Sequence, residues 1–202
     1  QPALIKNCIS NVNVTGGNKV GGIVGTTSKA RASELRKIEN CASYGNLDAI
    51  GNIGGIVGSV ESPITVTDSY NRGNTSASGF NVGGIVGYMS HTKAKVANCY
   101  TTGSVSGKSA HSVIGKKEGG TVDNCYYLSS LTADTNAAAI SEEDLKAMKF
   151  SAPITSFVKA PSGVNDGFPI FEFQKPAEEP GADDLADRGV HAELTLEVHG
   201  HH

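Results

Sequence analysis

From residue 5 to residue 128 the chain alternates short apolar segments with polar turn residues. One pattern recurs: an Ile or Val, a variable residue, Asn or Asp, Cys or Ser, and then a short alternating stretch. Its five copies are IKNC from Ile5, IENC from Ile38, VTDS from Val66, VANC from Val96 and VDNC from Val122. Short pieces bounded by Asn, Gly and Thr predict β-strands joined by tight corners, with two strands in each repeat.

A glycine-rich hexapeptide follows the first three copies. It reads VGGIVG at 20–25, IGGIVG at 53–58 and VGGIVG at 82–87, and a worn copy, SVIG, stands at 112–115. Paired glycines permit a close approach of backbones or a positive φ, and the following Ile-Val supplies buried β-branched bulk. The glycines expected to have this structural role are Gly21, Gly22, Gly25, Gly54, Gly55, Gly58, Gly83, Gly84 and Gly87.

The spacing of the repeats predicts the fold class. Gly22, Gly55 and Gly84 are 33 and 29 residues apart. A unit of this size cannot bury its own apolar face, whereas stacked units can. We therefore expect an all-β solenoid, most naturally a parallel β-helix, over residues 1–130. Because the fourth hexapeptide has lost its double glycine and the fifth repeat has none, regular coiling is expected to weaken after about residue 110.

The four cysteines, Cys8, Cys41, Cys99 and Cys125, occupy one position of the repeat, where the third copy has Ser69. On neighbouring coils in register these side chains would lie about 4.8 Å apart and point the same way, which is poor geometry for a disulfide. We expect buried thiols that act as small hydrophobic groups. Two disulfides, Cys8–Cys41 and Cys99–Cys125, are the alternative that an oxidising exterior would permit.

The hexapeptide, preceded by a strand of the type Asn-Cys-Tyr-(Asn/Thr)-x-Gly, resembles the GLUG motif. This motif occurs in large bacterial surface and secreted proteins, including adhesins and the non-catalytic regions of some IgA-cleaving metallopeptidases. The resemblance covers residues 5–128. Residues 141–174, with SEEDLKAM and NDGFPIF, resemble the helix and closing strand that often follow such repeats. The resemblance implies a β-solenoid body and an extracellular location, on a bacterial cell surface or secreted. It implies no enzymatic activity.

Residues 131–174 are expected to cap the solenoid. Ser141 followed by Asp144 resembles a capping box and predicts a helix near 141–148. Most of the phenylalanines lie in 153–174, and this bulky segment is expected to cover the exposed end of the stack. Residues 175–202 are acidic and rich in Pro and Gly, which predicts a linker or tail, partly non-native. Within this tail, HAELTLEV at 191–198 suits an edge strand, and His199, His201 and His202 suit a tag remnant.

Charge and composition exclude two classes of function. Residues 1–174 carry 15 basic and 13 acidic side chains, and residues 175–202 carry 2 and 7, so the basic stripe of a nucleic-acid-binding protein is missing. No run of 18 apolar residues is present, and we expect no membrane insertion. With no leader ahead of Gln1, we expect a mature protein or an excised fragment.

We expect no catalytic residue, metal site or cofactor. The sequence has no HExxH, GxSxG or P-loop motif. Glycosidases need two carboxyl groups about 5–9.5 Å apart. Asp68 and Asp123 are assigned to one repeat position, two coils and about 10 Å apart, without an arginine or aromatic platform. His91 and His111 are expected in polar, solvent-exposed loops.

Basic residues follow the hexapeptide in three of the four repeats. They are Lys29, Arg31, Arg36, Lys37, Lys93, Lys95, Lys116 and Lys117. In stacked coils these loops would lie along one edge and form a strip that attracts acidic glycans, phosphates or an acidic protein. The alternative is that these loops are charged simply because they are solvated.

The sequence therefore favours a non-catalytic structural or adhesive module. It would present loops to a host glycoprotein, an acidic glycan or neighbouring domains of the same polypeptide. Two alternatives stay open: an accessory region of a secreted metallopeptidase, and a β-helical carbohydrate-active enzyme.

Overall fold

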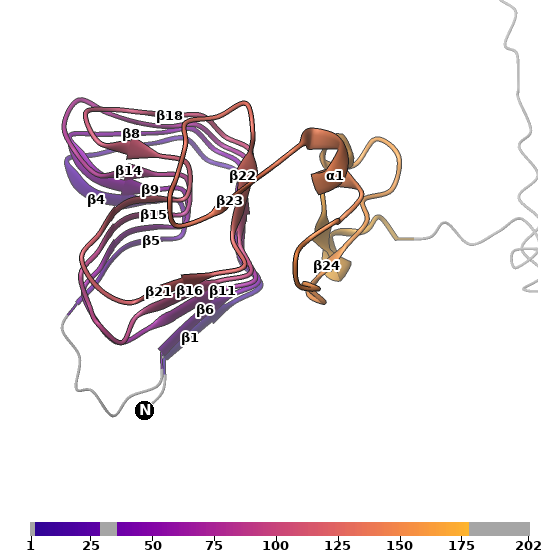
Figure 1. Cartoon of the computed structure of the whole chain (residues 1–202), viewed down its shortest axis with the longest axis horizontal. Coiled ribbons are helices and arrows are strands. Elements are labelled where there is room, and N and C mark those ends of the chain that lie inside the picture. The colour runs from indigo at the N-terminus through magenta and orange to yellow at the C-terminus, as the bar shows by residue number, and fades with distance from the viewer. Residues whose placement is uncertain (1–2, 29–35, 178–202) are drawn as a thin grey trace, which may run out of the picture.

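The computed structural model describes residues 3–28 and 36–177. The described residues up to Leu128 wind into a parallel β-solenoid (Figure 1). The expected all-β solenoid class is confirmed. Each coil contributes one strand to each of five parallel sheets, so the expectation of two strands per repeat is wrong. Four coils are complete, and β21 and β22 begin a fifth.

The sheets are named A to E in the order in which the chain visits them. Sheet A contains β1 (Ala3–Lys6), β6 (Arg36–Glu39), β11 (Thr65–Thr67), β16 (Lys95–Ala97) and β21 (Thr121–Asp123). Sheet B contains β2 (Ile9–Ser10), β7 (Ala42–Ser43), β12 (Tyr70–Asn71), β17 (Tyr100–Thr101), β22 (Tyr126–Leu128) and β23 (Ala138–Ile140). Sheet C contains β3 (Val14–Thr15), β8 (Leu47–Ala49), β13 (Thr75–Ala77) and β18 (Val105–Ser106). Sheet D contains β4 (Asn18–Gly21), β9 (Gly51–Gly54), β14 (Val82–Gly83) and β19 (Ala110–His111). Sheet E contains β5 (Val24–Thr27), β10 (Val57–Val60), β15 (Val86–Met89) and β20 (Ile114–Lys117).

A residue with left-handed backbone turns the chain from sheet A to sheet B in every coil. These residues are Asn7, Asn40, Asp68, Asn98 and Asn124, with φ between 49° and 56°. Asn and Asp visit this region more readily than other non-glycine residues. Their side chains also bond along the stack: Asn40 Nδ2 donates to Asn7 Oδ1 at 3.2 Å, and Asn124 Nδ2 donates to Asn98 Oδ1 at 2.9 Å. The recurrent Asn therefore sets both the corner and the register.

The cysteine position comes directly after this residue and forms the expected column, because the flanking strands pair in register. Cys41, Cys99 and Cys125 are buried, Cys8 of the first coil is exposed, and all four are free thiols in the structure. Each side chain at this position contacts the carbonyl two residues earlier. Cys99 Sγ lies 3.1 Å from Ala97 O, for example. The column thus lines the interior corner with small groups, and only its first member is exposed.

The double glycines allow the corner between sheets D and E to fold into the coil interior. A Cβ on Gly55 would lie 2.0 Å from Gly84 O and 2.3 Å from Asn71 Cγ, both in the next coil. A Cβ on Gly84 would lie 2.3 Å from Ser112 O. Close approach between coils, and not a positive φ, therefore requires glycine here.

The worn fourth hexapeptide belongs to the last coil and does not interrupt the coiling. His111 and Ser112 occupy the double-glycine position, yet β19 and β20 pair in register with β14 and β15. The expectation that coiling weakens after residue 110 is wrong. A double glycine is needed only where another coil packs closely above it. Gly115 is retained because its closest neighbours, such as Gly87 O at 2.6 Å from a built Cβ, belong to the preceding coil.

A second column of glycines has its exception in the first coil. Gly45, Gly73 and Gly103 form a column between sheets B and C, where a Cβ would lie 1.8–2.0 Å from a carbonyl oxygen of the preceding coil. The register of β3 and β8 places Val12 at this position in the first coil. Val12 is 63% exposed. A side chain fits there because no described coil precedes it.

Asp134 closes the C-terminal edge of sheet E. In the inner coils the N–H groups of Ile85 and Val86 both donate to Val113 O at 3.0 Å. In the last coil the corresponding N–H groups of Val113 and Ile114 donate to Asp134 Oδ2 at 2.8 and 2.7 Å. The aspartate is buried and replaces the carbonyl that a further coil would supply.

The chain then leaves the stack and forms a cap (Figure 1). The cap contains α1 (Glu142–Lys146), β24 (Phe157–Val158), the 3₁₀ turn η1 (Asn165–Gly167), β25 (Ile170–Phe171) and the 3₁₀ turn η2 (Glu172–Gln174). Ser141 Oγ accepts a hydrogen bond from Asp144 N at 3.1 Å, which confirms the predicted helix start. β24 and β25 pair antiparallel, so the predicted closing strand is also present.

The cap covers the side of the solenoid, so the expectation that the Phe-rich segment covers its end is wrong. The outward residues of sheet B are Ala42, Tyr70, Tyr100 and Tyr126 in one register column. They form one apolar cluster with cap residues Leu145, Ile154, Phe157, Phe168 and Phe171. The tyrosine face of sheet B is an apolar surface that needs cover, and Asp134 and β23 already occupy part of the C-terminal end.

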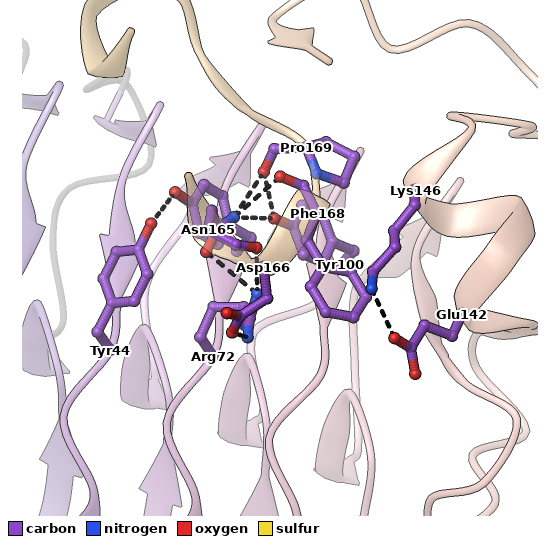
Figure 2. A network of polar contacts seen from close by, with 10 residues as sticks. Tyr44, Arg72, Tyr100, Glu142, Lys146, Asn165, Asp166, Phe168 and Pro169 are labelled. Atoms are coloured by element: carbon purple, nitrogen blue, oxygen red, sulfur yellow. Dashed lines mark hydrogen bonds and ion pairs between the residues drawn. The ribbon is translucent and has the colours of Figure 1, made fainter. Parts of the chain in front are cut away.

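Arg72 ties the cap to the third coil (Figure 2). Its Nη1 donates to Asn165 O at 2.8 Å, and its Nη2 pairs with Asp166 Oδ2 at 2.7 Å. The guanidinium carbon lies 4.3 Å from the centre of the Phe168 ring. The largely buried side chain of Arg72 therefore makes both an ion pair and a cation–π contact with the cap.

Two further contacts extend this attachment to the second and fourth coils. Tyr100 Oη donates to Pro169 O. Gln174 bridges Tyr70 on β12 and Tyr44, which directly follows β7. Gln174 Nε2 donates to Tyr44 Oη at 3.1 Å and its Oε1 accepts from Tyr70 Oη at 2.8 Å. The cap thus spans several coils and resists their separation.

Candidate functional site

The corner between sheets E and A is the most variable part of the coil. Sheets A and B, B and C, and D and E are joined by connections of constant length in the four coils. The E-to-A connections, by contrast, run from Thr27 to Arg36, Val60 to Thr65, Met89 to Lys95 and Lys117 to Thr121. We call residues 28, 61–64, 90–94 and 118–120 the variable edge. Loops that vary on a constant scaffold are where binding residues concentrate.

The structure brings most of the predicted basic residues to this edge. Lys29 and Arg31 lie outside the described residues. Lys93 lies in the variable edge itself, and Arg36, Lys37, Lys95, Lys116 and Lys117 lie on the strands that flank it. Lys37 and Lys95 share one register column of sheet A, with Thr65 between them.

Acidic partners that the sequence analysis did not consider interrupt the strip. Glu39 pairs with Lys37 and, at 3.0 Å, with Lys6. Hydrogen bonds from Lys37 and Lys6 lower the pKa of Glu39 below its ordinary value. Lys116 pairs with Glu118 at 2.7 Å. Lys37 and Glu39 both lie on β6, where residues two apart share a face, and Glu118 directly follows β20, so the Lys-x-Glu spacing could have revealed both pairs.

Lys116 and Glu118 also contact Tyr88 of the neighbouring coil. Tyr88 Oη donates to Glu118, and the Lys116 ammonium lies 5.9 Å from the centre of the Tyr88 ring. The hydrogen bonds from Lys116 and Tyr88 lower the pKa of the Glu118 carboxyl. This part of the edge is therefore locally neutralised.

Three of the predicted basic residues keep an uncompensated charge. Lys93, Lys95 and Lys117 are exposed and make no ion pair within the part of the chain that the structure describes. These three lysines are the part of the predicted basic strip that forms a cationic surface in the described structure.

The register corrects the assignment of the two aspartates. Asp123 pairs with Ala97, which pairs with Thr67, so Asp123 and Asp68 do not share a repeat position. Asp68 is a corner residue, and its Oδ1 accepts from Asn98 Nδ2 at 3.3 Å and from Ser156 Oγ at 2.7 Å. Asp68 thus has a structural role in the corner ladder and at the cap.

Of the two histidines, one lies in a loop as predicted and the other does not. His91 does lie in a loop, where its Nδ1 accepts from Lys93 N at 3.1 Å. His111 lies on β19, half-buried, with Nδ1 2.9 Å from Gly115 O, so its predicted place in an exposed loop is wrong. The described residues contain no group of three or more His, Cys, Asp or Glu side chains arranged to hold a metal ion. The tail histidines and the strand predicted at 191–198 lie outside the described residues.

Comparison with known proteins adds one finding. The sequence matches no known family profile and no curated protein. The fold matches the crystal structure of a "putative immunoglobulin A1 protease" from Bacteroides ovatus, with a TM-score of 0.64 and 22% identity. The match covers 85% of this chain and 58% of that protein. At this identity the likeness establishes the shared solenoid fold. Among the described residues, no helix is long and apolar enough to cross a membrane.

Proposed function

We propose that this chain is a non-catalytic, GLUG-type scaffold module of a bacterial surface or secreted protein. One observation carries the proposal: the E-to-A connections differ most in length, from three to eight residues, whereas the C-to-D connections vary from one to four and the other three are constant. A scaffold that varies most along one edge suits the presentation of that edge to a partner. The cap contacts with several coils support rigidity.

The partner that best fits the variable edge is an acidic glycan or a host glycoprotein that carries one. Lys93, Lys95 and Lys117 supply exposed positive charge and make no ion pair with any residue that the structure describes. Binding of this kind is long-range and salt-dependent, because the charges are solvated.

Binding of heparin-derived and sialylated oligosaccharides at increasing salt tests the proposal. We expect affinity to fall with salt, and to be lost in the variant with Lys93→Glu and Lys95→Glu. The control combines Lys108→Glu and Lys159→Glu, which change net charge equally at exposed sites away from the edge. Salt-independent binding, equal losses in both variants, or no binding would contradict the glycan assignment.

The likeness to the Bacteroides ovatus protein favours a second candidate, an accessory region of a secreted protease. The chain spans only 58% of that protein's length, so a catalytic domain would lie outside the matched region. Deleting this segment from its parent polypeptide would then lower activity on a large substrate but spare cleavage of a short peptide. We assign no catalysis to the module itself, and a glycan-cleavage screen that found turnover would revive the carbohydrate-enzyme alternative.

A further inference from the structure

Sheets A, B and E line the main hydrophobic core of the solenoid, which includes Val66, Val86 and Tyr127. These three sheets end differently at the C-terminal end of the stack. Sheet B continues into β23, and the N–H groups at the edge of sheet E are bound by Asp134. Within residues 3–28 and 36–177, sheet A ends at β21 and has no sixth strand. The chain passes from β22 to β23 across the end of the stack and so leaves the outer edge of β21 open.

Val122 presents unpaired backbone groups at that edge. Thr121 N donates to Ala94 O at 3.0 Å, and Asp123 O accepts from Asn98 N at 3.1 Å. Alternate residues of a parallel strand bond on opposite sides, so the N–H and C=O of Val122 point away from β16. The described residues supply no partner for either group. Buried or half-buried strand groups of this kind are templates for another strand.

A groove runs along the same edge. Two adjoining hollows of about 490 and 360 Å³ share Val122, Thr135 and Asn136 as lining residues. One extends to Lys117 and the other to Pro153, so the groove follows β21 and the start of the next corner. Both hollows are open to solvent, as a surface site for an extended peptide would be.

The side chains of sheet A specify what would pair there. Val122 ends the column of Ile38, Val66 and Val96, and it packs against the main core. A residue opposite Val122 would therefore be aliphatic. Asp123 is exposed, with no ion pair among the described residues, so a residue opposite it would be basic.

The other end of sheet A already shows this pairing. Lys6 lies opposite Glu39 in the column that ends at Asp123, with Nζ and Oε1 3.0 Å apart. Ile5 precedes Lys6 and lies opposite Ile38. The aliphatic-basic sequence of β1 is thus a template for the partner strand.

We propose that this groove binds an extended peptide segment of a partner protein as a parallel sixth strand of sheet A. The segment carries an aliphatic residue opposite Val122 followed by Lys or Arg opposite Asp123. Main-chain hydrogen bonds supply affinity and the two side chains supply specificity. A second copy of the chain stacked coil on coil is not the occupant, because β23 already fills the place in sheet B where β2 of that copy would have to pair. The groove adjoins the variable edge at Lys117 and Gly120, but the strand pairing rests on β21 and does not depend on the glycan assignment.

A labelled short peptide containing Leu-Ile-Lys, the sequence of β1, tests the proposal by fluorescence anisotropy with the full chain. We expect Asp123→Lys to weaken binding about tenfold, and a Leu-Ile-Glu peptide to recover it. Asp48→Lys is the control, since Asp48 is exposed on sheet C. Val122→Pro should abolish binding, because it removes an N–H that the ladder to β16 does not use.

Three results would overturn the assignment: no binding by either peptide, equal binding to the wild type and Asp123→Lys, or failure of the charge exchange. Should Val122→Pro unfold the chain, a peptide N-methylated at its Ile amide tests the backbone bonds instead, and unchanged affinity for it contradicts strand addition. Concentration-dependent self-association in sedimentation, lost in Asp123→Lys, would assign the groove to a second copy and also reject the proposal.

Discussion

The rings of Tyr70 and Tyr100 stack with their centres 4.8 Å apart and their planes within 4° of parallel. The spacing is that of neighbouring strands, so the stack follows directly from the register of β12 and β17. Phe157 packs edge-on against both rings. The stack therefore couples solenoid register to cap docking.

Removing Tyr100 should destabilise the chain in two separable steps. Tyr100→Phe keeps the stack but removes the hydroxyl that donates to Pro169 O and accepts from Asn165 Nδ2, at a cost of about 1–3 kcal/mol in unfolding free energy. Tyr100→Ala also leaves a cavity, for about 3–5 kcal/mol. Urea unfolding measures both, with Tyr88→Phe at the exposed edge as the control expected to cost under about 1 kcal/mol. Equal losses in Tyr100→Phe and Tyr88→Phe would contradict the buried contact.

Gly84→Ala should be severely destabilising, whereas Gly17→Ala should be nearly neutral. A Cβ on Gly84 would lie 2.3 Å from Ser112 O, but a Cβ on Gly17 would meet nothing within 4 Å. Overpacking of this kind costs about 1–3 kcal/mol or more. Thermal unfolding of the two variants decides the matter, and similar melting temperatures would refute the close packing of the coils.

Asp134→Ala should loosen the last coil selectively. It leaves the N–H groups of Val113 and Ile114 buried without an acceptor, for a cost of about 1–3 kcal/mol. Amide hydrogen exchange should speed up at these two residues more than at Ile56 and Val57 of the second coil. Uniform exchange changes along the stack would show that Asp134 does not act as a local edge cap.

Thiol labelling should distinguish the first coil from the rest. Burial raises the pKa of Cys41 to about 11 and also raises that of Cys99. Thiolate is the reactive form, so native protein at pH 8 should be alkylated at the exposed Cys8 and spared at Cys41, Cys99 and Cys125. Unfolding without reductant should expose all four thiols to mass-spectrometric detection. Recovery of fewer than four would establish the alternative disulfide pairing.

Glu39 should make stability depend on acid pH. Lys37 and then Lys6 lower its folded pKa below the ordinary 4.5, so its contribution is complete above pH 4.5 and disappears as pH falls through the lowered pKa. The unfolding free energy of Glu39→Gln should fall below that of wild type at pH 7 and approach it at lower pH. Glu143→Gln, without an ion pair among the described residues, is the control. A constant difference across pH would contradict the linkage.

The solenoid could be predicted from sequence because its cause is periodic. The Asn of the A-to-B corner, the cysteine position and the double glycine recur in register, and each recurrence reports one stacking contact. The number of strands per coil could not be predicted, since strands as short as β7 and β12 carry no periodicity of their own.

The cap and the site were harder to predict for physical reasons. The cap position depends on the tyrosines of sheet B, whose outward direction follows from the corner geometry and not from their sequence. The basic strip was anticipated only in outline, because the partners of Lys37 and Lys116 are set by strand faces. Asp134 gives no local signal at all, as its role depends on an edge formed by residues some twenty positions earlier.

The exceptions in the two glycine columns bear on how such a chain can change length. The second and third coils carry glycine wherever a neighbour would otherwise collide, so either can sit beside a copy of itself. The first coil has Val12 and the last has His111 and Ser112, and neither could be moved inward without a steric conflict. Duplication of the second or third coil would therefore add a unit that stacks without conflict, whereas duplication of the first or the fourth coil would bring Val12, or His111 and Ser112, against a neighbouring coil.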